Sequence, residues 1–549
     1  MTVAAPARSP SVAKSMFAGG LDGGWLMPFP VAGEDEMERV RDLIAVLREY
    51  CSAEVDGRAL EEQGWIGDEL VRCFAERGLM GLGIPREYGG QGLSMTGYCR
   101  MFEEFGRIDQ AMALVLGIHQ SIGTRGIVEF GTEEQKERLL PDLADGRRLA
   151  AFALTEPGNG SDAYNITSRA VRRPDGSWRL NGSKCFIGNG STGSVFVTIA
   201  RAEAGGRDRH VALILEKGME GFEHGERYGT LGLRANDVRP LRFNDVRVPP
   251  ENVLGEPGEG FRIAMRILEN GRLAIAATNV GCAKFLSSRI LEHVHSRHQF
   301  GRPLADFELV KEKLGWIAER LFAVECMTYL TAGVQDAGLP DRQLETAICK
   351  VTATDFVNDV ANRALDLRGG MGYMHDEPYE RILRDVRVFP IFEGANDVLR
   401  TWIAQKGMGA VMAALQRGDE PPGDPVPGEL REVAGQARRL REVTQRLMMR
   451  HGEAVRARQL DQHRLAHSIA EIYQQAAVAS RMAQLAEEEP DDERLGAART
   501  IADAFRRRSA RRVAAHLDAA EEGAADDDVA ALAASVYEHG PHGHAFAAI

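Results

Sequence analysis

Hydrophobic residues in the first 150 positions recur with the period of an α-helix. In one segment they are three or four positions apart, which places them on a single helical face: Met37, Val40, Leu43, Ile44 and Leu47. Similar spacing continues to Glu133–Leu140, with glycine-rich turns such as Gly89–Gly92 between the segments. We therefore predict a helical domain over residues 33–150. Only Arg8 and Lys14 are basic before Asp22, so we expect the extension 1–32 to be a disordered tail rather than a targeting leader.

The pattern changes to short β-type runs after residue 150. Val195–Ala200 and Val211–Leu215 are rich in β-branched and apolar residues and are bounded by glycine and charged residues. Pro174–Ser177 has the composition of a turn between two extended segments. These features predict a central β domain over residues 151–260.

Helical periodicity returns after residue 260 and continues, with few breaks, to about residue 408. The predicted helices are Phe261–Leu268, Ala276–Ser296, Leu309–Ala337 and Arg342–Leu367. We assign residues 261–408 to a helical bundle domain. A segment rich in Pro, Gly and Asp indicates a linker over residues 409–430, and the Ala- and Arg-rich remainder predicts a helical domain over residues 431–549. The fold class is therefore mainly α with a central β domain.

Composition and charge exclude several classes of function. The net charge of −13 argues against a nucleic-acid partner. The seven cysteines form no CxxC pair, which favours neither a zinc ribbon nor a disulfide framework and suggests a reducing compartment. No apolar run approaches the ~20 residues that span a bilayer. We expect a cytoplasmic protein. The arginines of segment 506–512 would either contact anionic lipid peripherally or, as we favour, form salt bridges on a helix face toward the acidic runs 487–493 and 526–528.

Two apparent ligand motifs do not fit their usual contexts. Gly188–Gly193 matches GxGxxG, but the predicted strand follows these glycines, whereas dinucleotide binding requires a strand before them and a helix after them. His293 and His295 are two positions apart on a predicted helix and so point to different faces. We predict no metal site.

A set of longer motifs, all before residue 401, indicates a family. In chain order they are ALTEPGNGSD (153–162), NGSKCFIGN (181–189), RHQFGRPL (297–304), GGMGY (369–373), ERILRD (380–385) and IFEGANDVLR (391–400). Together they resemble the acyl-CoA dehydrogenase family. LGIHQSIG at 116–123 and FEGANDVLR at 392–400 are similar to its very-long-chain branch, which also carries an additional C-terminal helical domain.

The resemblance implies both a fold and a reaction. The fold would consist of a helical domain, a β-barrel-like domain, a four-helix bundle and the C-terminal helical domain. The reaction would be FAD-dependent α,β-dehydrogenation of a medium-to-very-long-chain acyl-CoA to trans-2-enoyl-CoA. The family's base, which takes the α-proton while the β-hydride passes to flavin N5, matches Glu393, and a nearby arginine matches Arg272. The structural alternatives are a carboxylate at a helix N-terminus and a surface ion pair.

Further positions match family residues that contact the cofactor or the substrate. The cofactor positions are Phe152, Leu154, Thr155, Ser161, Phe186, Gly188, Arg297, Phe300, Asp366, Gly369, Gly370, Ala395 and Asp397. The substrate positions are Ser161, Gly117, Phe392 and Gly394. By the resemblance, Arg297 and Phe300 reach the cofactor across a subunit interface. The glycines could equally serve a turn or a helix cap.

Three of these positions depart from the family pattern. Gly188 and Ala395 stand where the family usually has a hydroxyl residue, and each lost donor is worth about 1 kcal/mol. Asp366 stands where a glutamine usually precedes the diglycine, and its charge would face an anionic diphosphate unless a cation such as Arg368 intervenes.

The resemblance also implies partners: an acyl-CoA substrate, an electron-transfer flavoprotein as electron acceptor, and a second copy of the chain in a homodimer. Two alternatives stay open. One is a biosynthetic relative that uses oxygen or a carrier-bound acyl group, and the other is a low-turnover flavoprotein with an assembly or scaffold role.

Overall fold

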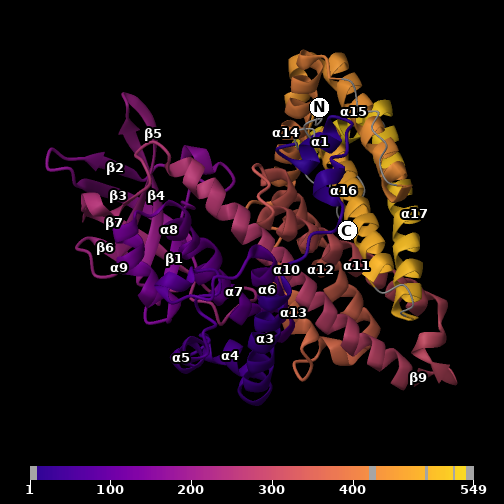
Figure 1. Ribbon diagram of the computed structural model, residues 1–549, viewed down its shortest axis with the longest axis horizontal. Coiled ribbons are helices and arrows are strands. Elements are labelled where there is room, and N and C mark those ends of the chain that lie inside the picture. Colours follow the sequence, from indigo (N-terminus) through magenta and orange to yellow (C-terminus); the bar gives the residue numbers. More distant parts are fainter. Residues whose placement is uncertain (1–8, 420–427, 489–492, 524–525, 540–549) are drawn as a thin grey trace, which may run out of the picture. The chain divides into compact units, whose positions relative to one another are not determined.

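The computed structural model describes residues 9–419, 428–488, 493–523 and 526–539, which fall into two compact units. The larger unit spans residues 26–398, and the smaller unit combines residues 1–25 with residues 399–549. Figure 1 shows the elements in the colours of the sequence.

The larger unit begins with short helices, as the periodicity predicts. They are α3 (Glu34–Glu54), α4 (Gly57–Gln63), α5 (Asp68–Glu76), α6 (Met95–Ile108), α7 (Gln110–Gly117), α8 (Arg125–Phe130) and α9 (Glu133–Ala144). A π-helical segment, Ile118–Gly123, continues α7. Local signals set several helix starts: Thr132 and Gln135 form a capping box at α9, and the Ser94 hydroxyl accepts the N–H of Gly97 at α6.

An eight-stranded sheet follows, which confirms the predicted β elements. Its strands are β1 (Ala150–Ala153), β2 (Arg169–Arg172), β3 (Trp178–Ile187), β4 (Val195–Ala204), β5 (Arg207–Glu216), β6 (Phe222–His224), β7 (Arg239–Val248) and β8 (Val253–Leu254). The order is β6-β7-β3-β2-β4-β5-β8, and β1 pairs in parallel with β4.

Strand β4 is buried on both faces. Val195, Val197 and Ile199 belong to a core shared with α8, α9 and the start of the next long helix, whereas Phe196 and Ala200 face a second core that contains Trp178 and Phe243. Because successive side chains alternate between the faces of a strand, a strand between two cores needs a continuous apolar run. This explains the unbroken hydrophobic stretch in the sequence.

The bundle contains α10 (Gly260–Ser296), α11 (Glu308–Asp336), α12 (Gln343–Arg368) and α13 (Tyr379–Val386). Helix α10 packs on β5 at its start and on α6, α11 and α12 further along, so it links the sheet to the bundle (Figure 1). The sequence predicted two helices, 261–268 and 276–296, but the structure forms one. Residues 269–275, which include buried polar side chains, continue the helix because α6 and α12 enclose them.

A short hairpin, β9 (His298–Gln299) and β10 (Arg302–Pro303), follows α10 at one end of the bundle. Lys313 Nζ lies 3.3 Å from Asp366 Oδ2, while Arg368 binds His293 Nδ1 at 2.7 Å and also Glu377.

The smaller unit is helical. It contains α1 (Val12–Phe17), most of α14 (Asn396–Arg417), α15 (Arg431–His451), α16 (Gln459–Glu488), α17 (Glu493–Glu522) and α18 (Asp526–His539), with α2 (Gly23–Leu26) at the boundary. The expectation of a disordered tail is wrong for α1, whose Val12, Met16 and Phe17 are fully buried. The expected linker 409–430 begins later in the structure, because α14 extends to Arg417, and its residues 420–427 lie outside the described residues.

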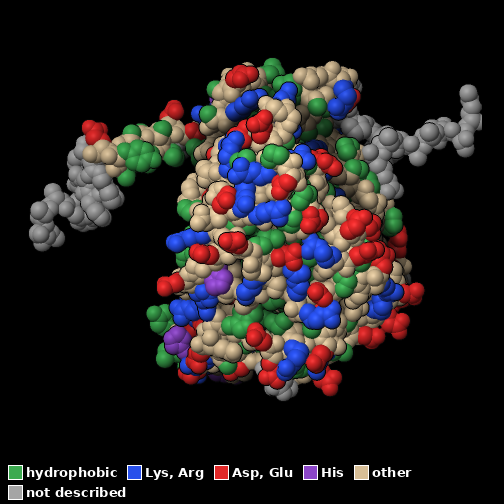
Figure 2. Space-filling view, turned by 90° about the vertical axis from the view of Figure 1, so that its left-hand side faces the viewer, with side chains coloured by type: hydrophobic (Ala, Val, Ile, Leu, Met, Phe, Trp, Pro, Cys, Tyr) green, Lys and Arg blue, Asp and Glu red, His purple; other side chains and the backbone are tan. Residues whose placement is uncertain are grey.

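Charged side chains of both signs alternate over the face of the protein shown in Figure 2. Within the arginine segment of α17, Arg506 lies 3.3 Å from Glu432 and Arg512 lies 2.9 Å from Glu471. These two arginines therefore form ion pairs, although Glu432 and Glu471 lie outside the acidic runs that we expected the arginines to face. None of the described helices is both long enough and apolar enough to cross a membrane.

Candidate active site

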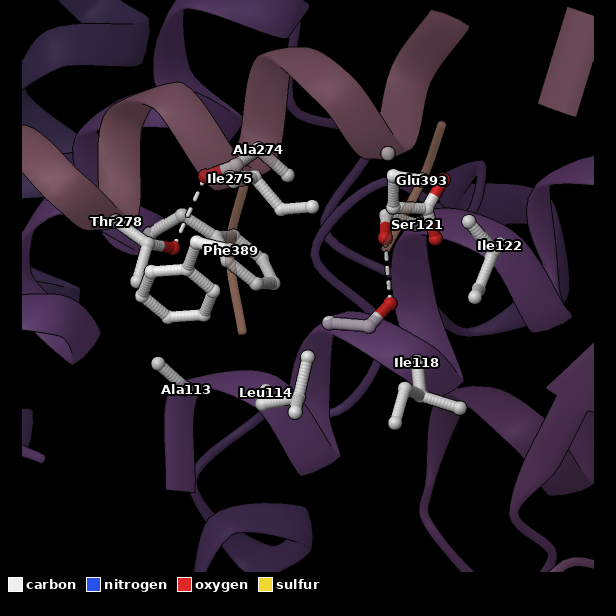
Figure 3. A pocket seen from close by; sticks show the side chains of 13 residues that line it. Ala113, Leu114, Ile118, Ser121, Ile122, Ala274, Ile275, Thr278, Phe389 and Glu393 are labelled. Atoms are coloured by element: carbon white, nitrogen blue, oxygen red, sulfur yellow. Dashed lines mark hydrogen bonds between the residues drawn. The ribbon is translucent and has the colours of Figure 1, made fainter. Parts of the chain in front are cut away.

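An apolar pocket lies between the helices α6, α7 and α10 and the segment that follows α13 (Figure 3). Its cavity volume is about 30 Å³, and the wider space between its walls, part of which is open solvent, is about 380 Å³. Its lining is Phe102, Ala113, Leu114, Gly117, Ile118, Ser121, Ile122, Gly271, Ala274, Ile275, Thr278, Phe389 and Glu393. The two hydroxyls are already engaged, since Ser121 donates to the Gly117 carbonyl at 2.5 Å and Thr278 donates to the Ala274 carbonyl at 2.9 Å.

Glu393 is the one ionisable residue in this lining. Its carboxylate lies near Ser121 and Ile122, and its Oε2 atom is buried without a hydrogen-bond partner among the described residues (Figure 3). Burial raises the pKa of Glu393 to about 7, although the positive charges of Arg272 and Lys350 act in the opposite direction. A carboxylate with this pKa can accept a proton near neutral pH.

The backbone that presents Glu393 is unusual. Glu393 has a φ angle of 55° and Gly394 has one of 96°, so two consecutive residues are left-handed. Glu393 lies three residues before Asn396, the first residue of α14. Arg272 is only 7 % exposed, and its Nε donates to the backbone carbonyl of Glu393 at 3.2 Å. It is therefore not a surface ion pair.

Glycines create the space around this carboxylate. A Cβ atom on Gly271 would lie 2.8 Å from Ile122 Cγ2 and 3.2 Å from Glu393 Oε2. A Cβ atom on Gly117, a predicted substrate position, would lie 3.3 Å from Phe102 Cε1. Side chains at these positions would reduce the pocket next to the Glu393 carboxylate.

Gly188, the main departure from the family pattern, borders the same region. A Cβ atom at this position would lie 2.3 Å from Ile118 Cδ1, and Ile118 lines the pocket. The side chain of Ile118 thus fills the space in which a hydroxyl residue at position 188 would project. No sequence pattern indicated that Ile118 takes the place of a side chain at position 188, because the two residues are far apart along the chain.

The cofactor positions on the sheet domain lie on β1, β3 and the loop after β1. Phe152 and Leu154 are buried, Thr155 is half-buried and Ser161 is exposed. The Cys185 N–H donates to the Thr155 carbonyl at 2.9 Å, which joins the loop to β3. Phe186 follows on β3, 67 % exposed and with a φ angle of 57°.

A buried ion pair that the sequence analysis missed strengthens this junction. Lys184 Nζ, with a fully buried side chain, donates to the Leu154 carbonyl and to Glu156, both at 2.8 Å. Burial opposes ionisation of Glu156, but the charge and hydrogen bond of Lys184, together with two hydrogen bonds from Thr167, outweigh it and hold the pKa of that carboxyl at about 2. The pair fixes the loop after β1 against β3, which carries Phe186 and ends just before Gly188.

The other predicted positions lie in two groups. Gly394 and Ala395 directly follow Glu393 in the chain. The ring centres of Phe392 and of Phe389 in the pocket wall are 5.4 Å apart. Asp397 is exposed in the first turn of α14. Arg297, Phe300, Asp366, Gly369 and Gly370 lie at the hairpin end of the bundle and do not line the pocket. One chain therefore does not bring all the predicted positions together.

Lys350 and Asn396 are further residues of this site that the sequence analysis missed. Lys350 Nζ donates to the Gly394 carbonyl and to Asn396 Oδ1, both at 2.8 Å. The available signal was a lysine on the same helical face as Ala347, Val357 and Ala361, where apolar residues predict burial.

Three family models match the chain. They are described as the N-terminal, middle and C-terminal domains of acyl-CoA dehydrogenase and match residues 37–147, 151–246 and 258–408. Very long-chain specific acyl-CoA dehydrogenase of Mus musculus is 38 % identical over 411 residues, which are 73 % of this chain and 63 % of that protein. The chain thus spans less than two thirds of the length of these very-long-chain relatives.

For a shorter relative and for a solved structure, the match covers nearly the whole length of the other protein. An acyl-CoA dehydrogenase of Bacillus subtilis is 37 % identical over 367 residues, which cover 66 % of this chain and 96 % of that protein. The crystal structure of an acyl-CoA dehydrogenase from Bacillus anthracis, complexed with FAD, superposes with a TM-score of 0.81 and 26 % identity over 94 % of both chains. This likeness extends over the additional C-terminal helices.

Proposed function

This chain belongs to the acyl-CoA dehydrogenase family, and from that premise we propose that it oxidises an acyl-CoA thioester to the trans-2-enoyl-CoA, with Glu393 as the general base. The observation that carries the proposal is the half-buried Glu393, whose carboxylate faces an apolar pocket and whose buried Oε2 has no hydrogen-bond partner among the described residues. An acyl chain fits such a lining, and a base is needed where its α-carbon would lie.

Two groups of Glu393, its carboxylate and its backbone N–H, act in the proton transfer. An α-proton of a thioester is a weak acid, so the base must be unprotonated yet basic enough near neutral pH, which a pKa of about 7 satisfies. By the resemblance, the backbone N–H of Glu393 donates to the thioester carbonyl and stabilises the negative charge that develops there. The apolar wall covers the Oε2 atom of the carboxylate, which is buried.

The exposed groups on the sheet domain fit FAD as the cofactor. The Phe186 ring is 67 % exposed, and Cβ atoms on Gly158 and Gly160 would meet nothing within 4 Å, so that loop leaves its backbone open to a ligand. Gly369 is left-handed and equally open, as a backbone cradle for phosphates requires. When bound, FAD supplies the acceptor for the β-hydride. Phe152, Leu154, Thr155, Ser161 and Phe186 would hold it.

We also propose that the chain acts as a homodimer. Several large apolar side chains are exposed at the hairpin end of the bundle, where the ends of α10, α11 and α12 meet: Leu291, Phe300, Leu309, Met371, Tyr373 and Met374. Phe300 is 93 % exposed, and a patch of this kind is typical of an interface. A second copy there would bring Arg297 and Phe300 to its neighbour's cofactor, and an electron-transfer flavoprotein is the electron acceptor that the family implies.

An anaerobic titration tests this function. The purified flavoprotein is mixed with acyl-CoAs of graded chain length, and bleaching of the flavin absorbance is expected for medium to very long chains. The Glu393→Gln variant should keep the flavin but lose the bleaching. Glu269→Gln is the matched control, because Glu269 is also a buried glutamate of this region but binds Arg266 at 2.7 Å and does not line the pocket.

The outcomes separate the alternatives. A protein that cannot be loaded with FAD would refute the proposal. Bleaching only with a carrier-bound acyl group, or rapid reoxidation of the reduced protein in air, would favour the biosynthetic alternative. Bleaching that survives in Glu393→Gln would exclude Glu393 as the base.

A further inference from the structure

The turn that carries Glu393 needs support from outside its own backbone. Left-handed conformation costs roughly 1–2 kcal/mol for a residue with a Cβ atom, so Glu393 with φ 55° is strained relative to a glycine. The following Gly394, with φ 96°, is also left-handed, and α14 begins two residues later at Asn396. Such a conformation persists only where surrounding groups hold it.

Two buried cations hold the two consecutive carbonyls of this turn. Arg272, on α10, donates to the Glu393 carbonyl at 3.2 Å. Lys350, on α12, donates to the Gly394 carbonyl at 2.8 Å, and its side chain is completely buried. A charged donor makes a stronger hydrogen bond than a neutral one, especially where water is excluded.

The lysine is itself fixed in place. Its Nζ atom also donates to Asn396 Oδ1 at 2.8 Å. The amide nitrogen of Asn396 in turn donates to Thr354 Oγ1 at 2.9 Å and to Asp355 Oδ1 at 2.8 Å, both on α12. Residues 394–396 are therefore attached to α12 at three side chains, and the position of Glu393 follows from the position of that helix.

We propose that Lys350 is a positioning residue for the general base: its ammonium group holds the Gly394 carbonyl and so fixes the turn from which the Glu393 carboxylate enters the pocket. The proposal rests on the proposed function for the role of Glu393 as a base. Lys350 itself does not line the pocket and acts through the turn.

The charge of Lys350 has a second consequence. The charged groups that act on Glu393 are Arg272 from α10 and Lys350 from α12, and the pocket residues of α6, α7 and the π-helical segment contribute none. Burial raises the pKa of Glu393, and both cations lower it. Loss of one cation should raise that pKa further, by about one unit, since an opposite charge at this range typically shifts a carboxyl by 1–3 units.

Two variants separate the charge from the hydrogen bond. Lys350→Met removes both, whereas Lys350→Gln removes the charge but keeps an N–H donor. Flavin reduction by a saturating acyl-CoA is measured anaerobically against pH. In both variants the midpoint of the pH profile should move upward by about one unit, which is a roughly tenfold lower rate on the acidic limb. In Lys350→Met alone the rate should also stay low on the alkaline plateau. If Lys350→Met fails to fold, Lys350→Gln still tests the charge.

A second readout is independent of activity. Thermal unfolding midpoints are measured across pH for four proteins: wild type, Glu393→Gln, Lys350→Gln and the double variant. In each background, the difference in midpoint between the protein that keeps Glu393 and the protein with Glu393→Gln reports the titration of Glu393 itself. Failure of the proposed function would leave this readout intact. Lys284→Met is the control, because Lys284 is a largely buried lysine of the same bundle that binds Glu103 and Glu325. Identical pH midpoints in wild type and both Lys350 variants would overturn the proposal.

Discussion

Glu393 combines two properties that each destabilise a folded chain, a left-handed backbone and a buried carboxylate whose Oε2 lacks a hydrogen-bond partner among the described residues. If this position had only a structural role, a glycine or an uncharged side chain there would make the folded chain more stable. Strain and a perturbed carboxyl in one pocket therefore point to chemistry.

Because the ionised Glu393 carboxylate lowers the free energy of unfolding, we predict that the effect of Glu393→Gln on stability depends on pH. Burial raises the pKa of Glu393 from an ordinary value near 4.5 to about 7. Between these values the unfolded chain releases a proton that the folded chain retains, so the free energy of unfolding falls as pH rises. Above pH 7 the accumulated penalty is about 3 kcal/mol. Glutamine removes it, so the variant should gain thermal stability over wild type at pH 8 and much less at pH 5.

The comparison for that experiment is Glu312→Gln, which removes a 55 % exposed carboxylate on α11 next to Arg363. An equal stability difference for Glu393→Gln at both pH values would show that the carboxylate is not buried in the way the structure has it.

At the scale of elements, the site depends on a close crossing of α6 and α10. Phe102 on α6 and Thr278 on α10 both line the pocket. A Cβ atom on Gly106 would lie 2.1 Å from the Thr278 carbonyl oxygen, and one on Gly281 would lie 1.8 Å from the Glu103 carbonyl oxygen. The two glycines thus let the helix backbones touch, which no other residue type would permit.

Gly281→Ala should accordingly destabilise the protein, although alanine is the better helix former by about 1 kcal/mol. The Cβ atom meets backbone, which cannot turn aside, so α6 and α10 must move apart and the pocket must widen. Gly315→Ala on α11 is the matched control, since a Cβ there meets nothing within 4 Å, and it should leave stability unchanged or raise it. Thermal unfolding of both variants checks this; a Gly281→Ala variant as stable as Gly315→Ala would contradict the described crossing.

Helices and strands of this chain follow from local patterns, whereas the details of the site do not. The period of Met37–Leu47 and the apolar run Val195–Ala200 predicted α3 and β4 because burial on one face or two leaves a direct trace in the sequence. The fusion of two predicted helices into α10 depends on α6 and α12, which enclose polar residues that would otherwise end a helix.

The motifs identified Glu393 and Arg272, but they could not show that Arg272 binds a backbone carbonyl rather than a carboxylate. The sequence motifs also did not indicate the roles of Lys350 and Ile118, because these roles depend on tertiary contacts. Each acts on a residue more than forty positions away, through a contact that only the tertiary fold creates.

At the scale of the whole molecule, the apolar side chains at the hairpin end of the bundle predict the oligomeric state. Replacing Phe300, which is 93 % exposed, and Tyr373, which is 76 % exposed, with aspartate should place charges in the proposed interface and convert the dimer to a monomer. The double variant should also lose FAD, because Arg297 would no longer reach its neighbour's cofactor. Light scattering coupled to gel filtration, with the flavin absorbance recorded, checks both.

Leu231→Asp serves as the control for that pair, since Leu231 is 62 % exposed but lies between β6 and β7, and its variant should remain a dimer with FAD. A wild-type protein that is monomeric at all concentrations would remove the basis for the proposed interface.

The central claim is that a single buried carboxylate, Glu393, takes the α-proton. The most direct test is the anaerobic rate of flavin reduction by a saturating acyl-CoA, measured from pH 5 to pH 9 in wild type and in Glu393→Gln. The rate in wild type should rise through one ionisation near pH 7, and the variant should be slower by about 10²–10⁴-fold at every pH. A rate that does not depend on pH, or one that Glu393→Gln retains, would contradict the account.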